Sequence, residues 1–402
     1  MPDRPTPALD RLVATDLATF TEQHWGRQAL LSRAADLPQP FTDLLDEPTV
    51  DELVSERGLR TPFLRVAKNG QTLGDKTFTA PGGVGAGIAD QLSDSRLTAL
   101  FGDGATLVLQ ALHRVWPPII DFVGALADEL GHPVQANAYV TPPQNQGFDD
   151  HYDVHDVFVL QVAGTKRWRI HAPVWESPLR DQPWTDRRAA VARAAAEPPL
   201  IEAVLEPGDC LYLPRGFLHA ATALGGVSTH LTLGVHTWTR YTLAEQLTTQ
   251  ALRSLVGDAD VRASLALGVD PTRPETLGPD VERVRAALLD AVRTADADTL
   301  VAALRRADRD SRRPAPVGPL RQLDTASTLE PTTVLRLREH LAATLDQTGG
   351  RSVLRSRAGE LALDEADVAP VKALLDDGHA AVTDLGDALA RRLLLAAVVV
   401  AD

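Results

Sequence analysis

The sequence feature that most constrains the fold is a pair of β-rich segments that carry three metal-ligating side chains. His151 and Asp153 stand two residues apart in the first segment, and His219 belongs to the second, much later in the chain. Side chains at positions i and i+2 of a β-strand point to the same face, so His151 and Asp153 can chelate one ion together if their segment is a strand. His219 can then supply a third ligand, which requires the two segments to lie side by side.

Two imidazoles and one carboxylate on one side of an octahedral metal leave three positions free, which is typical of non-haem Fe(II) oxygenases. The His-x-Asp pattern alone is weak evidence, because it occurs by chance and a histidine among apolar residues is more often a packed core residue. The surrounding sequence therefore decides how these residues are interpreted.

That surrounding sequence predicts strands and turns. Residues 156–162 are rich in β-branched and aromatic side chains, residues 163–165 indicate a turn, and Lys166 opens a returning strand. A turn at residues 206–209 precedes an apolar strand at 210–213, which Pro-Arg-Gly interrupts just before the second histidine ligand. Both ligand segments are therefore expected at strand ends beside turns.

The motifs around the ligands occur in an order shared with one protein family. They are Asn137-Ala-Tyr139, His151-Tyr-Asp153, Phe158-Val-Leu-Gln and Gly164-Thr-Lys166-Arg-Trp168. They resemble the JmjC (cupin-like) ribosomal oxygenases, a family of Fe(II)- and 2-oxoglutarate-dependent protein hydroxylases. The resemblance runs from about residue 63 to about residue 238.

The resemblance implies an iron site and a 2-oxoglutarate site. His151, Asp153 and His219 match the family's iron ligands. Lys166 matches the basic residue that pairs with the distal carboxylate of 2-oxoglutarate, a task that suits an ammonium group. Without the motif, Lys166 would be interpreted as a solvated lysine in a turn.

Polar residues on two further strands match positions around the co-substrate. Asn137 and Tyr139 form an i, i+2 pair that matches residues lining the pocket, although Tyr139 also suits ordinary barrel packing. Ser228, Thr229 and His230 lie on the strand that closes the site in relatives. His230 equally suits a hydrogen-bonded core histidine.

His155 leaves one alternative open. It shares a face with His151 and Asp153, so spacing alone would also allow Asp153 and His155 to chelate the ion. The family pattern places the ligand histidine before the aspartate, so His155 is assigned to the pocket rim or the substrate side.

The implied cofactor is Fe(II), with 2-oxoglutarate and O₂ as co-substrates. The hard chemistry belongs to the metal and the co-substrates, while the protein orients them and excludes water. A second layer of groups should orient the ligand imidazoles. Asp149, Asp150 and Asp156 are nearby carboxylates that could do so, although the first two also suit solvated loop charges.

Charge and cysteine content bear on the partner and the location. The chain has 402 residues, 54 acidic against 40 basic, and a formal net charge of -14, which disfavours direct nucleic-acid binding and fits a basic polypeptide substrate. Its single cysteine, Cys210, excludes an internal disulfide and favours a cytoplasmic protein. The apolar run at residues 393–401 is too short to cross a bilayer, so no membrane contact is expected.

The chain is expected to begin with a mixed cap and a mainly β core. Residues 1–100 form the N-terminal cap, with a helix at 17–31 and a hairpin that turns at Lys68-Asn-Gly70. Residues 101–240 form the JmjC oxygenase core, a double-stranded β-helix if the family applies. The Arg- and Ala-rich composition of residues 184–197 predicts a helical insert that interrupts the core.

Two smaller zones are expected to follow the core. Residues 241–311 carry apolar stripes at helical spacing, which form a dimer interface in the family, or else pack on the chain's own core. Residues 320–402 resemble a winged-helix module, with a helix at 333–345. The remaining predicted elements are strands at 351–355 and 360–363 and helices at 364–375 and 385–395.

The winged-helix-like zone normally suggests DNA binding, but acidic residues crowd its candidate helices and would repel phosphates. A structural or protein-contacting role is therefore favoured. These residues are Asp364, Glu365, Asp367, Asp376, Asp377, Asp384 and Asp387.

Three functions are compatible with the sequence. The first is hydroxylation of a histidine or arginine side chain of a protein, with a basic ribosomal protein expected by family analogy and a homodimer as the expected assembly. The second is hydroxylation of a peptide precursor in natural-product biosynthesis, since a fold can be redeployed while its substrate groove changes. The third is a non-catalytic metal-binding cupin scaffold, which the complete set of ligands and Lys166 disfavours. JmjC proteins also include histone demethylases, but the resemblance to hydroxylases is closer.

Overall fold

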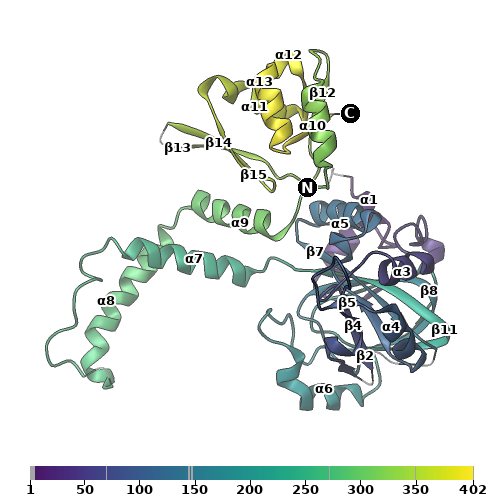
Figure 1. Ribbon diagram of the computed structural model, residues 1–402. Coiled ribbons are helices and arrows are strands. Elements are labelled where there is room, and N and C mark those ends of the chain that lie inside the picture. Colours follow the sequence, from purple (N-terminus) through teal and green to yellow (C-terminus); the bar gives the residue numbers. More distant parts are fainter. Residues whose placement is uncertain are drawn as a thin grey trace. The chain divides into compact units, whose positions relative to one another are not determined.

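The chain folds into two compact units, Met1–Thr237 and Trp238–Asp402, in a computed structural model. The structure describes residues 5–68, 70–143, 145, 148–270, 272–348 and 350–401. Unit 1 is built on one large antiparallel sheet with helices on its outside, and unit 2 is a set of helices followed by a small α/β module (Figure 1). Each unit is described separately.

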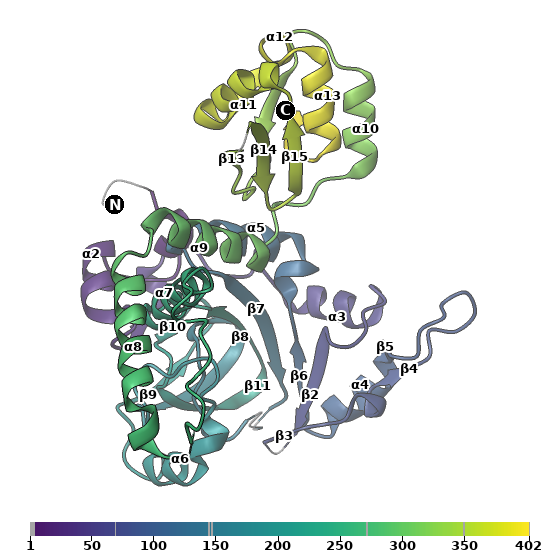
Figure 2. The same ribbon diagram turned by 90° about the vertical axis from the view of Figure 1, so that its left-hand side faces the viewer.

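The sheet of unit 1 has nine strands in the order β1-β10-β8-β11-β7-β6-β2-β3, with β9 paired to β8. Every pairing in it is antiparallel, and the sheet curves strongly around a concave side (Figure 2). Its strands are β1 (Leu30–Ser32), β2 (Leu64–Lys68), β3 (Gln71–Thr72), β6 (Thr106–Leu109), β7 (Val134–Thr141), β8 (Asp156–His171), β9 (Ile201–Leu205), β10 (Cys210–Leu213) and β11 (Leu218–Val235).

The turn that the sequence predicts at residues 163–165 is wrong. β8 runs without interruption through this stretch, and β11 pairs with it along almost its whole length. Gly164 has a φ of 60°, and a Cβ at this position would overlap the carbonyl oxygen of Val227. The glycine therefore bends a continuous strand where it passes close to its neighbour, instead of reversing the chain.

Strand β8 is buried on both of its faces. Phe158 and Leu160 point into the main core, which the N-terminal segments and helix α5 (Pro117–Leu130) cover. Val157 and Val159 alternate with them and point to the concave side, where they join a second apolar cluster with Trp168 and Ile170. The concave side is therefore the enclosed interior of the unit.

The N-terminal region packs on the outside of the sheet and contributes strands to it. The helix predicted at residues 17–31 is wrong in its second half, because helical structure ends at His24 and Leu30–Ser32 pairs with β10. The predicted hairpin is present as β2 and β3, with Asn69 of its turn outside the described residues. The helices and short strands here are α1 (Pro7–Asp10), α2 (Leu17–Thr19), η1 (Phe20–His24), η2 (Ala34–Asp36), α3 (Glu47–Ser55), η3 (Asp75–Thr77), β4 (Thr79–Ala80), β5 (Gln91–Leu92), α4 (Asp94–Gly102) and η4 (Leu112–Arg114).

The insert between β8 and β9 is helical, as the composition predicts. It consists of η5 (Trp184–Arg187) and α6 (Arg188–Ala195), and Val191 of α6 is buried against Tyr152 and Leu218. The insert thereby packs against the segment that carries the first two candidate ligands.

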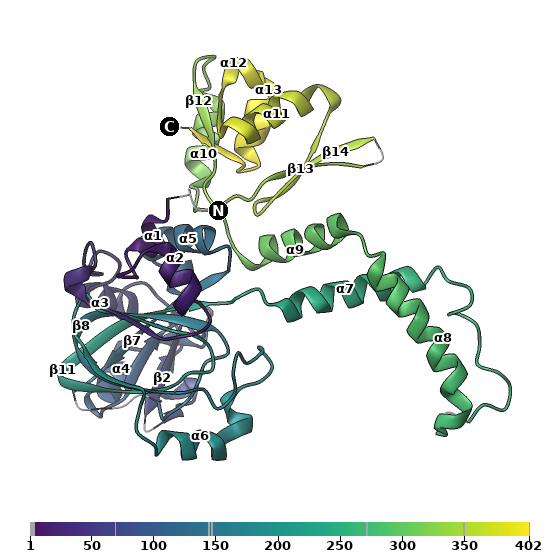
Figure 3. The same ribbon diagram turned by 180° about the vertical axis from the view of Figure 1, so that it is seen from behind.

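Unit 2 begins with three helices, α7 (Arg240–Leu255), α8 (Pro274–Arg293) and α9 (Ala297–Ser311), which Figure 3 shows as consecutive rods. No residue of α8 is fully buried, and Val281, Val284, Leu289 and Val292 are exposed. None of the helices in the described part of the chain combines the length and apolarity that a bilayer span needs.

The module after α9 contains two small sheets, β16-β12-β17 and β13-β14-β15. The helix predicted at residues 333–345 is wrong, because Leu335 is buried between exposed neighbours in a strand and pairs with both β16 and β17. The elements are α10 (Pro319–Ser327), β12 (Val334–Leu337), β13 (Thr344–Thr348), β14 (Arg351–Ser356), β15 (Gly359–Leu363), α11 (Glu365–Asp377), β16 (His379–Ala381), α12 (Val382–Leu385), α13 (Asp387–Leu395) and β17 (Val399–Ala401).

Candidate metal centre

Three potential ligands meet on the concave side of the unit 1 sheet. His151, Asp153 and His219 place one ligand atom each within 4.8 Å of one another, the one such group found among the described residues. His219 Nε2 lies 3.7 Å from Asp153 Oδ2. The sequence-predicted triad is thus brought together by segments that are far apart in the chain.

The backbone holds the two histidine ligands side by side. The N–H of His151 donates to the carbonyl of His219 at 3.2 Å, and the N–H of His219 donates back at 2.8 Å. His151 therefore forms an isolated β-bridge with His219, whereas the i, i+2 spacing of His151 and Asp153 was interpreted as part of a β-strand. Tyr152, between the two ligands in the sequence, is buried, and its hydroxyl donates to the carbonyl of Gln182 at 3.0 Å. The N–H of Gly216 donates to the carbonyl of Asp153 at 3.0 Å, which gives this segment a second backbone contact.

Main-chain carbonyls orient the two ligand imidazoles. His151 Nδ1 lies 2.7 Å from the carbonyl oxygen of Asp149, and His219 Nδ1 lies 3.1 Å from that of Phe217. A protonated Nδ1 donates to such a carbonyl and leaves the Nε2 lone pair free for a metal. Both histidines therefore present Nε2 to the centre of the triad.

Of the three carboxylates expected to orient these imidazoles, Asp149 contacts His151 through its main-chain carbonyl, and the other two have other partners. Asp150 pairs with Arg169 at 3.4 Å. Asp156 is buried, accepts a hydrogen bond from the Tyr212 hydroxyl at 2.7 Å and accepts another from the N–H of Arg215 at 3.0 Å. The backbone therefore performs the role that the sequence assigned to acidic side chains.

The protonation states suit a divalent cation. Burial, together with the neighbouring His151 imidazole, lowers the pKa of His219 to about 4. Burial alone would raise the pKa of the Asp153 carboxyl, but the imidazoles of His155, His219 and His151 hold it below its ordinary value. A neutral imidazole and an ionised carboxylate are the forms that bind metals.

A buried cavity extends from the triad toward Lys166. Lys166 is only 3% exposed, and its Nζ donates to Thr141 Oγ1 at 3.1 Å and lies 3.5 Å from His230 Nδ1. No carboxylate in the described part of the chain forms an ion pair with it, and burial lowers its pKa to about 7. The residues that line the cavity are Thr106, Tyr139, Phe148, His151, Asp153, Val157, Val159, Lys166, Trp168, His219, Ala220, Ala221, His230 and Thr232.

Aromatic rings line the cavity that joins the triad to Lys166. Tyr139 stacks on His230 with ring centroids 4.9 Å apart, and Trp168 meets His230 edge-on at 5.4 Å. Burial, with the nearby Lys166 ammonium, lowers the pKa of His230 well below its ordinary value. His230 is therefore a neutral core histidine beside Lys166 and is not part of the triad.

The family model for the "JmjC domain" matches residues 121–243. Ribosomal oxygenase 1 of Rattus norvegicus is 38% identical over 144 residues, which are 35% of this chain and 24% of that protein. The bifunctional lysine-specific demethylase and histidyl-hydroxylase NO66 of Drosophila mojavensis is 33% identical over 226 residues, 54% of this chain and 23% of that protein. The chain therefore contains a JmjC domain and is similar to ribosomal oxygenases over part of its length. It spans about a quarter of the length of these two relatives.

Solved structures agree with the JmjC match at the level of the fold. The crystal structure of the Escherichia coli ribosomal oxygenase YcfD matches with a TM-score of 0.56 and 18% identity, and the match covers 97% of this chain and 99% of that one. The mainly β, JmjC/cupin-like core expected from the sequence is confirmed.

Two predicted pocket residues do not line the cavity of this JmjC domain. Asn137 Oδ1 accepts a hydrogen bond from the N–H of Ala111 at 3.0 Å, and Ser228 Oγ accepts one from Gln161 Nε2 at 2.9 Å. Both side chains hold neighbouring segments of the sheet in place. Tyr139 does line the cavity.

His155 does not take part in the triad. Its ring stacks on His236 at 5.1 Å, and its Nε2 lies 3.3 Å from Gln135 Nε2. The alternative pair of Asp153 and His155 is therefore not formed.

Sequence reasoning missed several lining residues. Thr106 lines the cavity, and its hydroxyl oxygen lies 3.3 Å from that of Thr141, which contacts Lys166 from behind the lining. Thr141 follows Tyr139 at i+2 on β7, so the alternation of that strand could have identified it. Phe148 gave no such signal, because it lies in a loop that tertiary packing brings within 6.0 Å of the His151 ring.

Proposed function

We propose that this protein is an Fe(II)- and 2-oxoglutarate-dependent oxygenase that hydroxylates a histidine or arginine side chain of a ribosomal protein. The observation that carries the proposal is the joint lining of one buried cavity by the His151, Asp153 and His219 triad and by Lys166, a cation without a carboxylate partner in the described chain. A metal site at one end and a lone ammonium at the other fit a co-substrate that chelates iron and ends in a carboxylate.

The donor set fits Fe(II). Two imidazole nitrogens and a carboxylate oxygen from one side leave open positions for other ligands, the arrangement of non-haem iron oxygenases. When bound, the iron supplies the oxidative chemistry, in which one atom of O₂ hydroxylates the substrate and the other enters succinate as 2-oxoglutarate loses CO₂.

The residues of this chain bind and orient the reactants. The Lys166 ammonium would hold the distal carboxylate of 2-oxoglutarate, with the Thr141 hydroxyl fixing the position of Nζ. Val157, Val159 and Trp168 give the cavity apolar walls that exclude water and strengthen this ion pair. One E. coli YcfD structure is described as a complex with cobalt and 2-oxoglutarate, which supports the same co-substrate here.

Support for a protein substrate comes from the relatives. The two reported above are named ribosomal oxygenase 1 and bifunctional lysine-specific demethylase and histidyl-hydroxylase. The net charge of -14 suits a basic ribosomal protein. Such a substrate and the single, buried cysteine also favour a cytoplasmic location.

Mass spectrometry of ribosomal proteins tests the proposed substrate. Cells that carry the gene should contain one ribosomal-protein peptide with the mass of one added oxygen on histidine or arginine, and cells without it should lack that mass. If all ribosomal proteins are unmodified and a small peptide product is hydroxylated instead, the protein acts in natural-product biosynthesis. If the iron-loaded protein also fails to form succinate, a scaffold function replaces the enzyme proposal.

The affinity for 2-oxoglutarate should fall as the pH rises above about 7. The pKa of the buried Lys166 is about 7 without a bound anion, and a carboxylate partner would raise it. Below pH 7 the lysine is already charged, whereas above it each binding event must take up a proton, so the dissociation constant should rise by up to about tenfold per pH unit. Anaerobic titration calorimetry from pH 6.5 to 8.5 would measure this rise, and a flat profile would contradict it.

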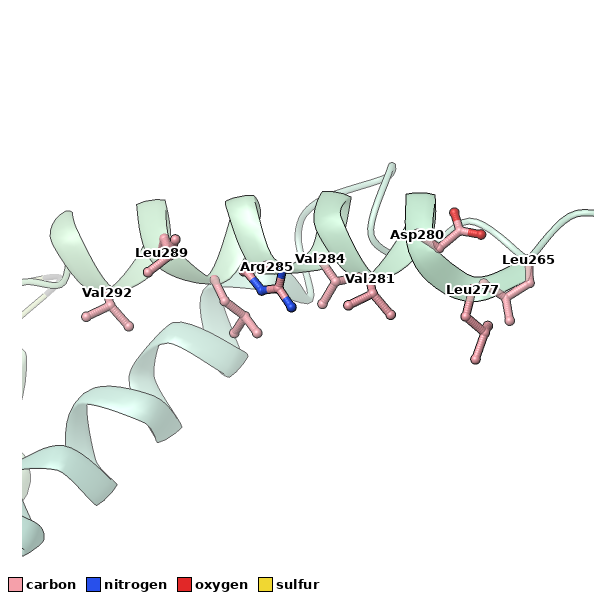
Figure 4. A pocket seen from close by; sticks show the side chains of 9 residues that line it. Leu265, Leu277, Asp280, Val281, Val284, Arg285, Leu289 and Val292 are labelled. Carbon is pink, nitrogen blue, oxygen red and sulfur yellow. The ribbon is translucent and has the colours of Figure 1, made fainter. Parts of the chain in front are cut away.

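We also propose that α7, α8 and α9 form the interface of a homodimer. Val281 and Val292 are 45% and 41% exposed, and Figure 4 shows them with Val284 on one side of α8. The cavity along this side is almost entirely apolar. A continuous apolar face of this kind is typical of a helix that packs against a partner, and a second copy brings an identical face.

Val284→Asp should convert the dimer to a monomer. A carboxylate in the middle of the face would be buried without a partner in the dimer, at a cost of several kcal/mol. Light scattering after size exclusion measures the mass. Leu320→Asp is the matched control, because the Leu320 side chain is exposed on α10, and this variant should remain dimeric. A dimer that persists in Val284→Asp would place the interface elsewhere.

A further inference from the structure

Unit 2 contains a polar cavity whose lining residues have not been assigned a role. Its volume is about 450 Å³, and it lies between α9 and the sheet β13-β14-β15. Four of its lining residues are arginines, namely Arg305, Arg306 and Arg309 from α9 and Arg355 from β14. This size is in the range of small-ligand sites.

The arginines of α9 are not neutralised by the acidic groups in the cavity. Asp346 pairs with Arg355 at 2.8 Å, and Glu360 also pairs with Arg355. Within the described chain, no ion pair involves Arg305, Arg306 or Arg309. The cavity lining therefore carries four arginines against two carboxylates, an excess of two positive charges, and the three arginines of α9 have no ion-pair partner in the described chain.

Asp308, on the same helix as these arginines, pairs with two arginines outside the cavity. Asp308 accepts hydrogen bonds from Arg312 at 2.9 Å and from Arg357 at 2.7 Å. The Arg357 side chain is only 2% exposed, so its pair with Asp308 anchors α9 to the sheet behind the cavity. Asp308 thus fixes the wall of the cavity without neutralising the arginines that face it.

Three guanidinium groups around one cavity repel each other unless an anion lies between them. Guanidinium groups present paired N–H donors that match the oxygen atoms of a phosphate group. We propose that the cavity between α9 and β13-β14-β15 binds a phosphate group, held by Arg305, Arg306 and Arg309 and supplied by the RNA backbone or by a small phosphorylated molecule.

The acidic residues that disfavour nucleic-acid binding lie elsewhere in the module. They belong to α11, α12 and α13 and to the residues just before these helices, and none of them lines the cavity. The expected repulsion of phosphates therefore applies to those helices and leaves the α9 face available.

Binding to the full-length protein tests the site with two probes. Fluorescence anisotropy with a labelled 20-nucleotide single-stranded RNA, at two salt concentrations, measures binding to a phosphodiester backbone, and calorimetry with inorganic pyrophosphate measures binding of a free phosphate compound. The test variant is Arg305→Glu with Arg309→Glu. The matched control is Arg313→Glu with Arg321→Glu, which makes the same charge change at two exposed arginines, one after the end of α9 and one on α10, that do not line the cavity. Circular dichroism and thermal melting check that both variants fold.

The test variant should weaken binding of at least one probe by about tenfold or more and should lower the salt dependence of RNA binding, whereas the control should stay within about twofold. Binding of RNA alone identifies the backbone as the source of the phosphate, and binding of pyrophosphate alone identifies a small molecule. Equal loss in the test and control variants, binding of neither probe, or preference for a polyglutamate peptide over both would overturn the proposal. The assay uses neither iron nor 2-oxoglutarate, so its outcome is independent of the proposed oxygenase activity.

Discussion

His151→Ala is expected to remove metal binding and to lower 2-oxoglutarate turnover by at least about 100-fold. The imidazole supplies one of only three protein ligands, and it lies with His219 and Asp153 in the one group of its kind among the described residues. Loss of a ligand leaves a single imidazole and a carboxylate, which hold a divalent ion weakly. Succinate release and the ratio of bound iron to protein measure the two effects.

Two further histidine variants make this result specific. His379→Ala changes an exposed histidine of unit 2 and should retain wild-type turnover. His155→Ala should retain one bound iron, because His155 stacks on His236 outside the triad. Wild-type succinate release by His151→Ala, or loss of iron from His155→Ala, would show that the metal ligands are assigned incorrectly.

Lys166→Met is expected to raise the KM for 2-oxoglutarate by at least about thirtyfold. The side chain is buried, its Nζ lies next to Thr141 and His230, and no described carboxylate pairs with it. Removal of one partner from a buried, hydrogen-bonded ion pair costs about 2–5 kcal/mol. The change should appear in KM, since the lysine would bind the co-substrate at the end remote from the iron.

Methionine is chosen because it keeps most of the volume of lysine and removes a buried charge, so the fold should be at least as stable. The melting temperature of Lys166→Met should therefore equal or exceed that of the wild type, and its iron content should be unchanged. This separates it from His151→Ala, which loses iron. A wild-type KM in Lys166→Met would remove the lysine from the 2-oxoglutarate site.

The ligands of the metal centre could be recognised from local sequence. His151 and Asp153 are neighbours in the chain, and their motif with Lys166 has a characteristic order. The turn at residues 206–209 and the strand after it also follow from local sequence, because Pro fixes its own φ and Gly208 accepts a φ of 94° that other residues rarely adopt. These features depend on a few adjacent residues.

The errors in the secondary structure have a common origin in long-range pairing. Ala163-Gly164-Thr165 has the composition of a turn, but β11 pairs with the chain on both sides of it and keeps β8 continuous. The stretch at 333–345 has helical spacing of apolar residues, but β12 has strand partners from residues 379–381 and 399–401. Pairing partners so distant in the chain override local propensity.

The sequence by itself determined the chemical identity of the site, because the types and spacing of His151, Asp153 and Lys166 define what can be bound. Only the tertiary structure decided which candidates share the cavity. The bridge between His151 and His219 joins the ligands, stacking on His236 holds His155 outside the triad, and strand register turns Ser228 toward Gln161 instead of the cavity. Burial of Lys166, and with it the lowering of its pKa, likewise arises only when β7, β8 and β11 close around it. The physical reason is that side-chain types are properties of single residues, whereas burial, register and hydrogen-bond partners depend on segments far apart in the chain.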